Sequence, residues 1–324
     1  MYCACISKTL RMRFPPCWPV AAMNETDLQL VQVIVSNSRM PYRELADRLE
    51  LSVTTVHKRI QALADRGFIN KFTVYPSPKI LPWMFVSVTG HSRVDSLDEA
   101  IGRVGRHPIT ERIAPASGDY LFVDGVVRDI SEVSRYVDFV VREASIAEPY
   151  VSLHDHSYLF GPGDDRFTNT DFKILSQLLD DSRKQAVDLS IELGVSVSTV
   201  RRRLDRMQKN RMILCTMHLD PSKSGDVFVI FLLTLRNGGD RSEVVKKIRE
   251  QYKKNLISLW VYDTMPDLIN INIWAKTMAE MKALRESLQR EDLFKKIVPI
   301  IPYEVKYYDT WLTRYIRDMA ASAE

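Results

Sequence analysis

The feature that most constrains this chain is an internal repeat. Residues 26–69 align without a gap on residues 170–213, at a constant offset of 144, and twelve of the 44 paired positions are identical. The longest shared pattern, Ser-Val-x-Thr-Val-x-x-Arg, starts at Ser52 in the first copy and at Ser196 in the second. So many matches in one register indicate a tandem duplication, and both halves are expected to share one fold.

Each copy opens with three short helical patterns. In the first copy, helical spacing of apolar residues begins at Leu28, a second short helix covers Tyr42 to Leu49, and Ser52 is a good N-cap for a third helix. Two short helices joined by a tight turn are typical of a helix-turn-helix unit. The apolar face of the third helix consists of Val53, Val56, Ile60 and Leu63. Its other residues are expected to face solvent or DNA, and the predicted DNA contacts are Thr54, Thr55, His57, Lys58 and Gln61.

The third helix of the second copy is strongly basic. It carries Arg201, Arg202, Arg203, Arg206, Lys209 and Arg211 against the single acid Asp205. Such a cluster repels itself unless an anion offsets it, although a solvated basic face is the plainer interpretation. On the third helix of a helix-turn-helix, it favours a surface that contacts phosphates and bases. The predicted DNA contacts of this copy are Ser198, Thr199, Arg201, Arg202 and Arg206.

Strand patterns follow each head. After Gly67, residues 68–76 alternate like the strand of a wing. Beyond Trp83 the first copy predicts strands at 84–91, 109–117, 120–127 and 148–159, with helices at 96–107 and 130–144. The second copy predicts strands at 227–236, 256–263, 268–275 and 299–308, with helices at 240–252 and 278–296. This βαββαβ order predicts an α+β, ferredoxin-like domain in each half.

The predicted sheets each leave one face uncovered, because their helices lie on the other face. The two sheets of one chain could pack face to face as an intramolecular pseudo-dimer, each could pair with another chain, or both could occur at once, and the sequence does not decide between these arrangements. The predicted segments are a head at 23–80, a ferredoxin-like domain at 81–160, a breaker-rich linker at 161–168, a head at 169–223, a ferredoxin-like domain at 224–308 and a C-terminal helical segment at 309–324.

Composition constrains where the protein is located more than what it does. The formal net charge of +4 excludes neither nucleic acid nor small ligands, and the longest apolar runs are too short to span a membrane. Three of the four cysteines lie within the first 17 residues, which argues against a disulfide framework and favours a cytoplasmic protein. Residues 1–22 are expected to be a disordered extension, with Met23 as an alternative start.

The residues from Glu44 to Ile60, followed by Leu63 and Gly67-Phe68-Ile69, resemble the DNA-binding head of the leucine-responsive regulator family, Lrp/AsnC. The βαββαβ unit resembles that family's ligand-binding and dimerising domain. The resemblance implies a transcriptional regulator that binds double-stranded DNA and senses a small effector such as an amino acid. It also implies an effector loop between the second and third strands, where Gly118 and Asp119 fit, although both residues are also ordinary turn formers. Ordinary family members have one head and one sensor domain, so their dimer architecture cannot be transferred unchanged to this tandem chain. The chain could also form a homo-oligomer.

Two other functions compete with the regulator. The two modules of each half also resemble those of siroheme decarboxylases. In such an enzyme the residues that could hold an acidic tetrapyrrole would be His154, His156, Arg112 and Arg128. The Trp-Pro-Tyr-Asn-like motif associated with those enzymes is missing, and a decarboxylase has no need of the basic third helix. The other rival is an architectural DNA binder with little sequence preference. We expect a regulator rather than an enzyme, without cofactor or metal, because no phosphate loop and no closed set of metal ligands is present.

Overall fold

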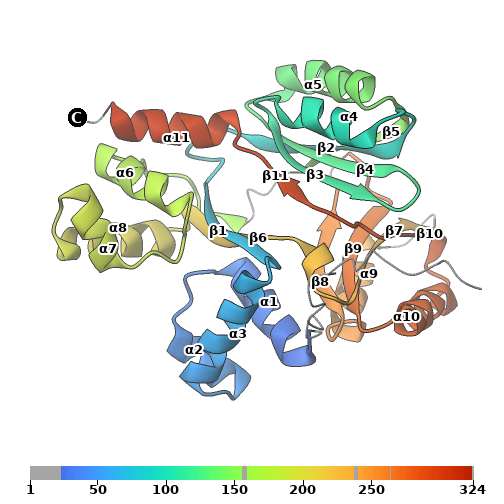
Figure 1. Cartoon of the computed structure of the whole chain (residues 1–324), viewed down its shortest axis with the longest axis horizontal. Helices are drawn as coiled ribbons and strands as arrows, with labels where there is room; N and C mark the ends of the chain where they lie inside the picture. The colour runs from blue at the N-terminus through green and yellow to red at the C-terminus, as the bar shows by residue number, and fades with distance from the viewer. Residues whose placement is uncertain (1–22, 155–158, 237–239, 263, 323–324) are drawn as a thin grey trace, which may run out of the picture.

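A computed structural model describes residues 23–154, 159–236, 240–262 and 264–322, so the extension predicted at 1–22 lies outside the described residues. The described chain contains two helix-turn-helix heads, each followed by a βαββαβ unit (Figure 1). The first half comprises α1 (Glu25–Ser36), α2 (Tyr42–Leu49), α3 (Val53–Asp65), β1 (Ile69–Pro76), β2 (Met84–Ser92), α4 (Leu97–Gly105), β3 (Thr110–Ala116), β4 (Tyr120–Val127), α5 (Ile130–Glu143) and β5 (Ile146–His154). The second half comprises α6 (Asn169–Leu178), α7 (Ala186–Leu193), α8 (Val197–Lys209), β6 (Ile213–Leu219), the 3-10 turn η2 (Pro221–Lys223), β7 (Val227–Leu235), α9 (Arg241–Gln251), β8 (Leu256–Val261), β9 (Leu268–Ala275), α10 (Met278–Arg290), β10 (Phe294–Ile300), β11 (Lys306–Tyr307) and α11 (Trp311–Ala321). The predicted α+β class and tandem organisation are confirmed.

The two heads form for the same local reasons. A capping box starts the first helix of each head, Asn24 with Asp27 in one copy and Thr168 with Asp171 in the other. A serine hydroxyl accepts a backbone N–H at the start of each third helix. The predicted apolar face of α3 is buried except at Val53, which is 46% exposed. That residue is the first of the helix, next to the cap, where α3 begins at the surface.

The two predicted wing strands pair with each other. β1 and β6 form a two-stranded antiparallel sheet, here called the wing sheet, in which Phe72 lies opposite Met217 and Val74 opposite Cys215. Hence neither strand serves as an independent wing of its own head. The wing sheet joins the two heads through backbone hydrogen bonds.

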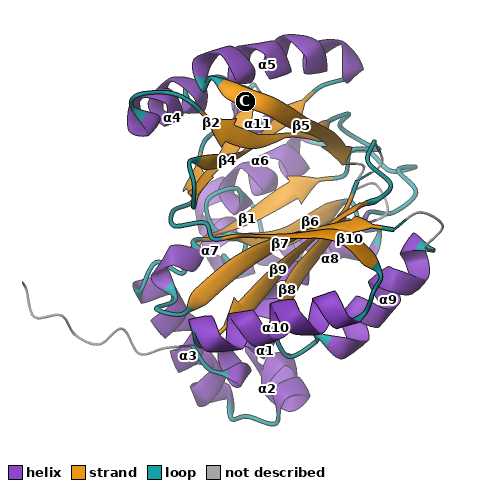
Figure 2. Ribbon diagram, turned by 90° about the vertical axis from the view of Figure 1, so that its right-hand side faces the viewer, coloured by secondary structure: helices purple, strands orange, loops and turns teal. Residues whose placement is uncertain are grey.

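The larger sheets pack face to face. Sheet 1 has the order β11-β3-β4-β2-β5 and sheet 2 the order β10-β7-β9-β8. Figure 2 shows α4 and α5 on one outer face of the stack, with α9 and α10 on the other. The residues between the sheets include Ala114, Ala116, Tyr120 and Phe122 from sheet 1, with Ile230, Leu232, Val298 and Ile300 from sheet 2. The intramolecular packing that the sequence left open is therefore present within this chain.

Each head packs on the sheet of the opposite half. The core of head 1, which includes Met23 and Leu28, continues into Phe228 and Trp274 of sheet 2. The core of head 2 continues instead into Trp83 and Val126 of the first half and into the C-terminal helix α11. That helix lies along α6, where the rings of Phe172 and Tyr315 meet edge to face (Figure 1). The crossed packing makes the two halves one body.

The end of the chain departs from the predicted pattern. The predicted helix at 278–296 stops at Arg290, and Asp292 adopts a left-handed conformation before β10 begins. The predicted strand at 299–308 is divided, because its last residues leave sheet 2 and form β11 against β3 of sheet 1. β5 begins earlier than predicted, at Ile146, and His154 is its last described residue. No helix within the described residues is long and apolar enough to cross a membrane.

Candidate nucleic-acid interface

The exposed face of α3 contains the residues that the sequence predicted. Thr54, His57, Lys58 and Gln61 are exposed, while Val56, Ile60 and Leu63 are buried beneath them. Gln61 donates a hydrogen bond to Asp65 one turn later, and the ring of His57 lies 5.2 Å from that of Tyr42. Thr55 is half-buried, and its hydroxyl lies 2.8 Å from that of the capping Ser52 at the start of the helix. α3 therefore offers a polar face of mixed hydrogen-bonding character.

The corresponding face of α8 is cationic. Arg201, Arg202 and Lys209 are exposed, and Ser198 lies exposed at the helix start. Thr199 repeats the capping geometry of Thr55, with its hydroxyl 2.9 Å from that of Ser196. Guanidinium and ammonium groups on one exposed face suit phosphate binding, which depends on charge more than on sequence.

Arg206 differs from the prediction. Its Nη2 atom donates to Asp171 at 2.6 Å and to the carbonyl of Arg166, and its Nη1 atom lies 3.4 Å from Asp165. Position 206 is three residues after Arg203, which pairs with the same fully buried Asp171, so both side chains lie on the side of α8 that faces α6. The guanidinium of Arg206 is thus engaged in holding head 2 together, and we correct its assignment as a DNA contact.

The heads meet at a pair of residues that the repeat conserves. The hydroxyls of Ser38 and Ser182 lie 2.6 Å apart, and they are equivalent positions of the two copies. Arg39 donates to the carbonyls of Ser182 and Lys184, at 2.6 and 2.9 Å, and Arg183 donates in return to the carbonyl of Ser38. The identical Ser-Arg pairs were visible in the aligned sequence, but nothing local showed that they lie on an internal pseudo-twofold axis. This junction joins the two heads, and with them the helices α3 and α8, within one chain.

The predicted effector loop is a tight turn between β3 and β4. Gly118 and Asp119 are exposed and both have positive φ, at 69° and 55°. The carbonyl of Gly118 lies 2.8 Å from the ring nitrogen Nδ1 of His91, and the carbonyl of Asp119 accepts from the backbone of Ser92. This geometry accounts for both residue types as turn formers, and the predicted effector role stays a prediction.

The candidates for tetrapyrrole binding are engaged in internal contacts. Arg112 pairs with the buried Asp124, which also accepts from Ser87, and the Ser87 hydroxyl lies 2.9 Å from Nε2 of buried His154. Arg128 pairs with Glu132 and its guanidinium lies 4.3 Å from the ring centroid of Trp311. His156 lies outside the described residues. Within the part that the structure describes, no group of three or more His, Cys, Asp or Glu side chains is placed to hold a metal ion.

Comparisons with known proteins agree with the duplicated head. A winged helix-turn-helix DNA-binding family model matches residues 23–70 and again residues 167–213. The transcriptional regulator LrpA of Pyrococcus horikoshii is 28% identical over 102 residues, which are 31% of this chain and 72% of the relative. The regulator LysM of Saccharolobus solfataricus is 26% identical over 121 residues, 36% of this chain and 83% of the relative.

A solved structure extends the similarity to the tandem arrangement. The siroheme decarboxylase NirDL covers 92% of this chain and 99% of its own, with a TM-score of 0.55 and 13% sequence identity. At that identity the likeness concerns the fold: two winged heads, each followed by an α/β domain. The sequence relatives, the repeated family match and the duplicated architecture together make this chain a tandem-duplicated member of the Lrp/AsnC-type helix-turn-helix family.

Proposed function

We propose that the protein is a sequence-specific DNA-binding transcriptional regulator whose affinity for DNA is modulated by a small effector. The observation that carries the proposal is the pair of unequal recognition helices. α3 exposes Lys58 and Gln61, and α8 exposes Arg201 and Arg202. The Ser38–Ser182 junction joins the two heads, so one chain can contact two half-sites without a partner chain.

The unequal faces suggest a division of labour. In this hypothesis α3 distinguishes base sequences, whereas α8 contributes mainly phosphate contacts that hold the duplex. The operator would then consist of two different half-sites, because a palindrome matches two identical heads.

The experiment compares duplex DNA from upstream of the protein's own gene with random duplex of equal length, over a series of salt concentrations. A regulator should prefer the upstream DNA by roughly a thousand-fold or more, with a steep salt dependence. Equal binding to both duplexes with a steep slope would replace the proposal with an architectural DNA binder. Absence of binding to either duplex would refute both.

Two matched variants test the division of labour. Arg202→Ala should weaken binding to specific and random DNA alike and reduce the salt slope by about one. Lys58→Ala should change which sequence is preferred, by roughly 1–3 kcal/mol at the affected base pair. Arg285→Ala, an exposed arginine on the outer helix α10, is the control and should leave both affinities unchanged. The hypothesis fails if Arg202→Ala and Lys58→Ala affect specific and random DNA identically.

The second candidate is a tetrapyrrole decarboxylase, which the full-length likeness to NirDL favours. The contacts of Arg112 and His154 with Asp124 and Ser87 weigh against it, because a ligand with several carboxylates needs cationic groups that are available to pair with it. A spectroscopic titration with siroheme tests this candidate. Stoichiometric binding with carboxyl loss would establish the enzyme.

A further inference from the structure

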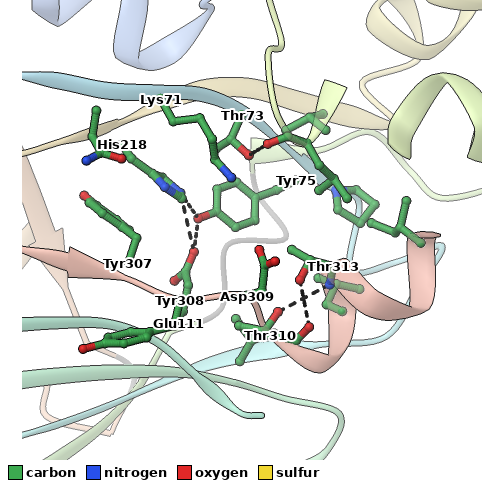
Figure 3. Close-up of a pocket in the computed structure, with 17 residues that line it drawn as sticks. Lys71, Thr73, Tyr75, Glu111, His218, Tyr307, Tyr308, Asp309, Thr310 and Thr313 are labelled. Atoms are coloured by element: carbon green, nitrogen blue, oxygen red, sulfur yellow. Dashed lines mark hydrogen bonds and ion pairs between the residues drawn. The ribbon is translucent and has the colours of Figure 1, made fainter. Parts of the chain in front are cut away.

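A cavity lies outside the DNA-facing surface, where the wing sheet meets sheet 1 and the C-terminal segment. Its volume is about 410 Å³, which is enough for a ligand the size of an amino acid. β1, β3, β4, β6, the end of α6 and residues 307–316 contribute to its walls. Figure 3 shows Lys71 and Asp309 reaching the cavity from different walls, with Tyr75, Glu111 and His218 directed toward one another.

The polar side of the cavity is built around a buried carboxyl group. The Tyr75 hydroxyl donates to Oε1 of Glu111 and lies 3.2 Å from Nε2 of His218. The imidazole of His218 stacks on the ring of Tyr307 at 3.9 Å, and its Nδ1 atom is buried with no hydrogen-bond partner among the described residues. Glu111 is 8% exposed. A carboxyl group held this far from water needs a reason, because burial of such groups is costly unless a partner cation compensates.

The repeat supplies an internal comparison for this cavity. Phe85 lies opposite Val126 in sheet 1 as Phe228 lies opposite Trp274 in sheet 2, and Arg112 and Ser258 occupy matching places beside Asp124 and Asn272. The positions equivalent to Thr73, Phe85, Glu111 and Val126 are therefore Met217, Phe228, Ile257 and Trp274.

We call the first set, with its cavity, the polar joint, and the second set the apolar joint. In the apolar joint all four side chains are buried in one hydrophobic cluster, and Trp274 is 1% exposed. The polar joint has Glu111 where the apolar joint has Ile257, and the small Val126 where it has Trp274. The same fold therefore closes this space with apolar side chains in one half and leaves a lined cavity with a carboxyl group in the other.

We propose that the cavity of the polar joint binds a small organic ammonium compound, either a free amino acid or a simple amine, whose cation pairs with Glu111. The apolar body of such a ligand would lie against Val126, Leu179 and Leu312. Lys71, 30% exposed, lies 3.9 Å from the exposed Asp180 in an ion pair, and we expect it to exchange this partner for a ligand carboxylate, which an amino acid has and a simple amine lacks. This inference rests on the proposed function for its effect on DNA, because the ligand would contact the wing sheet that joins the heads.

Burial raises the pKa of Glu111 to about 7, against the opposing influence of the Tyr75 hydrogen bond and the Arg112 charge. The titratable and charged groups that face Glu111 are Lys71 and Tyr75 from β1, Arg112 from its own strand, Asp124 from β4, Tyr136 from α5, His218 from β6 and Tyr307 from β11. An ammonium ligand favours the ionised carboxylate, so binding near pH 6.5 should release up to one proton. Calorimetry in two buffers of different ionisation enthalpy measures that release.

The test is calorimetric titration of the full-length protein, without DNA, with each of the twenty L-amino acids and with isoamylamine and cadaverine. We expect at least one to bind with a dissociation constant below about 1 mM. If an amino acid binds and the two amines do not, the ligand is a zwitterion held by Glu111 and Lys71 together. If an amine binds equally well, the ammonium group alone is recognised. No binding by any of these compounds would overturn the proposal.

Two variants and one control locate the site. Glu111→Gln should weaken binding at least about tenfold and abolish proton release. Val126→Phe, which fills the cavity in the manner of Trp274, should abolish binding while the far-ultraviolet circular dichroism spectrum stays unchanged. Asp119→Asn, in the turn predicted as the effector loop, should leave binding unchanged. Loss of binding in Asp119→Asn but not in Val126→Phe would overturn the assignment of the cavity.

DNA binding separates this proposal from the proposed function. A saturating ligand should shift the affinity for upstream DNA by about fivefold or more. Ligand binding without any DNA binding would refute the regulator and leave the ammonium site standing. An unchanged DNA affinity in saturating ligand would refute the regulatory role of the site.

Discussion

The two joints between the wing sheet and the large sheets differ in the way they reach stability. The apolar joint buries Trp274 and Ile257 and continues directly into the core of head 1. The polar joint leaves a cavity, buries Glu111, and is completed by residues near the start of α11. The two halves are copies, so equivalent packing would be expected at both joints. A buried carboxyl group and a cavity both lower the free energy of unfolding, so the polar joint is expected to contribute less stability than the apolar joint.

The largest expected difference between the joints is the effect of truncating equivalent side chains. Trp274→Ala should lower the free energy of unfolding by roughly 3–5 kcal/mol, because it opens a large void in a closed core. Val126→Ala should cost only roughly 1–2 kcal/mol, because its side chain is smaller and already borders a cavity. Urea unfolding of both variants checks this. Equal losses would mean that the two joints are packed alike, which would remove the contrast.

The second difference is electrostatic and appears as a dependence of stability on pH. Burial raises the pKa of Glu111 to about 7 and lowers that of His218 to about 3. Stability from Glu111 is present below its unfolded pKa near 4.5 and is lost as pH rises toward 7. Stability from neutral His218 is present above its unfolded pKa near 6.5 and is lost as pH falls toward 3. Between pH 4.5 and 6.5 the two effects oppose each other.

Replacing either Glu111 or His218 should therefore reveal how the other residue alone makes the free energy of unfolding depend on pH. In Glu111→Gln, the free energy of unfolding should decrease by up to about 1.4 kcal/mol for each pH unit below 6.5, because only the unfolded state gains a proton at His218. His218→Gln should show the reverse slope, losing stability as pH rises from 4.5 to 7. Chemical denaturation at four or five pH values measures both slopes. Two flat profiles would show that the groups do not titrate as a compensating pair.

The secondary-structure elements and the tandem fold could be predicted from the sequence, but the two joints could not. The repeat, the cap at Ser52 and the βαββαβ order are local patterns, so they predicted the elements and the tandem fold. The joints depend on contacts between strands more than 30 residues apart, such as Tyr75 with Glu111 and His218. No periodicity reports such contacts.

The candidate site was predictable to a similar extent. Helical spacing placed Lys58 and Arg202 on exposed faces, but it also placed Arg206 there. The acid that holds Arg206 inward, Asp171, lies on α6, which spacing within α8 cannot show. The offset between the copies is 144 in the heads but 148 between Val126 and Trp274, so the aligned sequence concealed that these two residues are counterparts. That equivalence becomes visible only from strand pairing.

The smallest expected difference between equivalent variants of the two halves is found at the junction of the heads, where the halves are most alike. The hydroxyls of Ser38 and Ser182 contact each other, but Ser182 also lies 3.3 Å from the carbonyl of Thr216, to which it can donate. In Ser38→Ala, Ser182 keeps this second partner, so the loss of stability should be roughly 0.5–1.5 kcal/mol. In Ser182→Ala the buried Ser38 hydroxyl loses its contact, and the cost should rise to roughly 1–3 kcal/mol.

The double variant should cost less than the sum of the two, because one interaction is removed in both. Urea unfolding of the three variants completes the cycle. Additive losses would mean that the serines act separately, and that the heads are joined by the arginine pairs and the wing sheet alone.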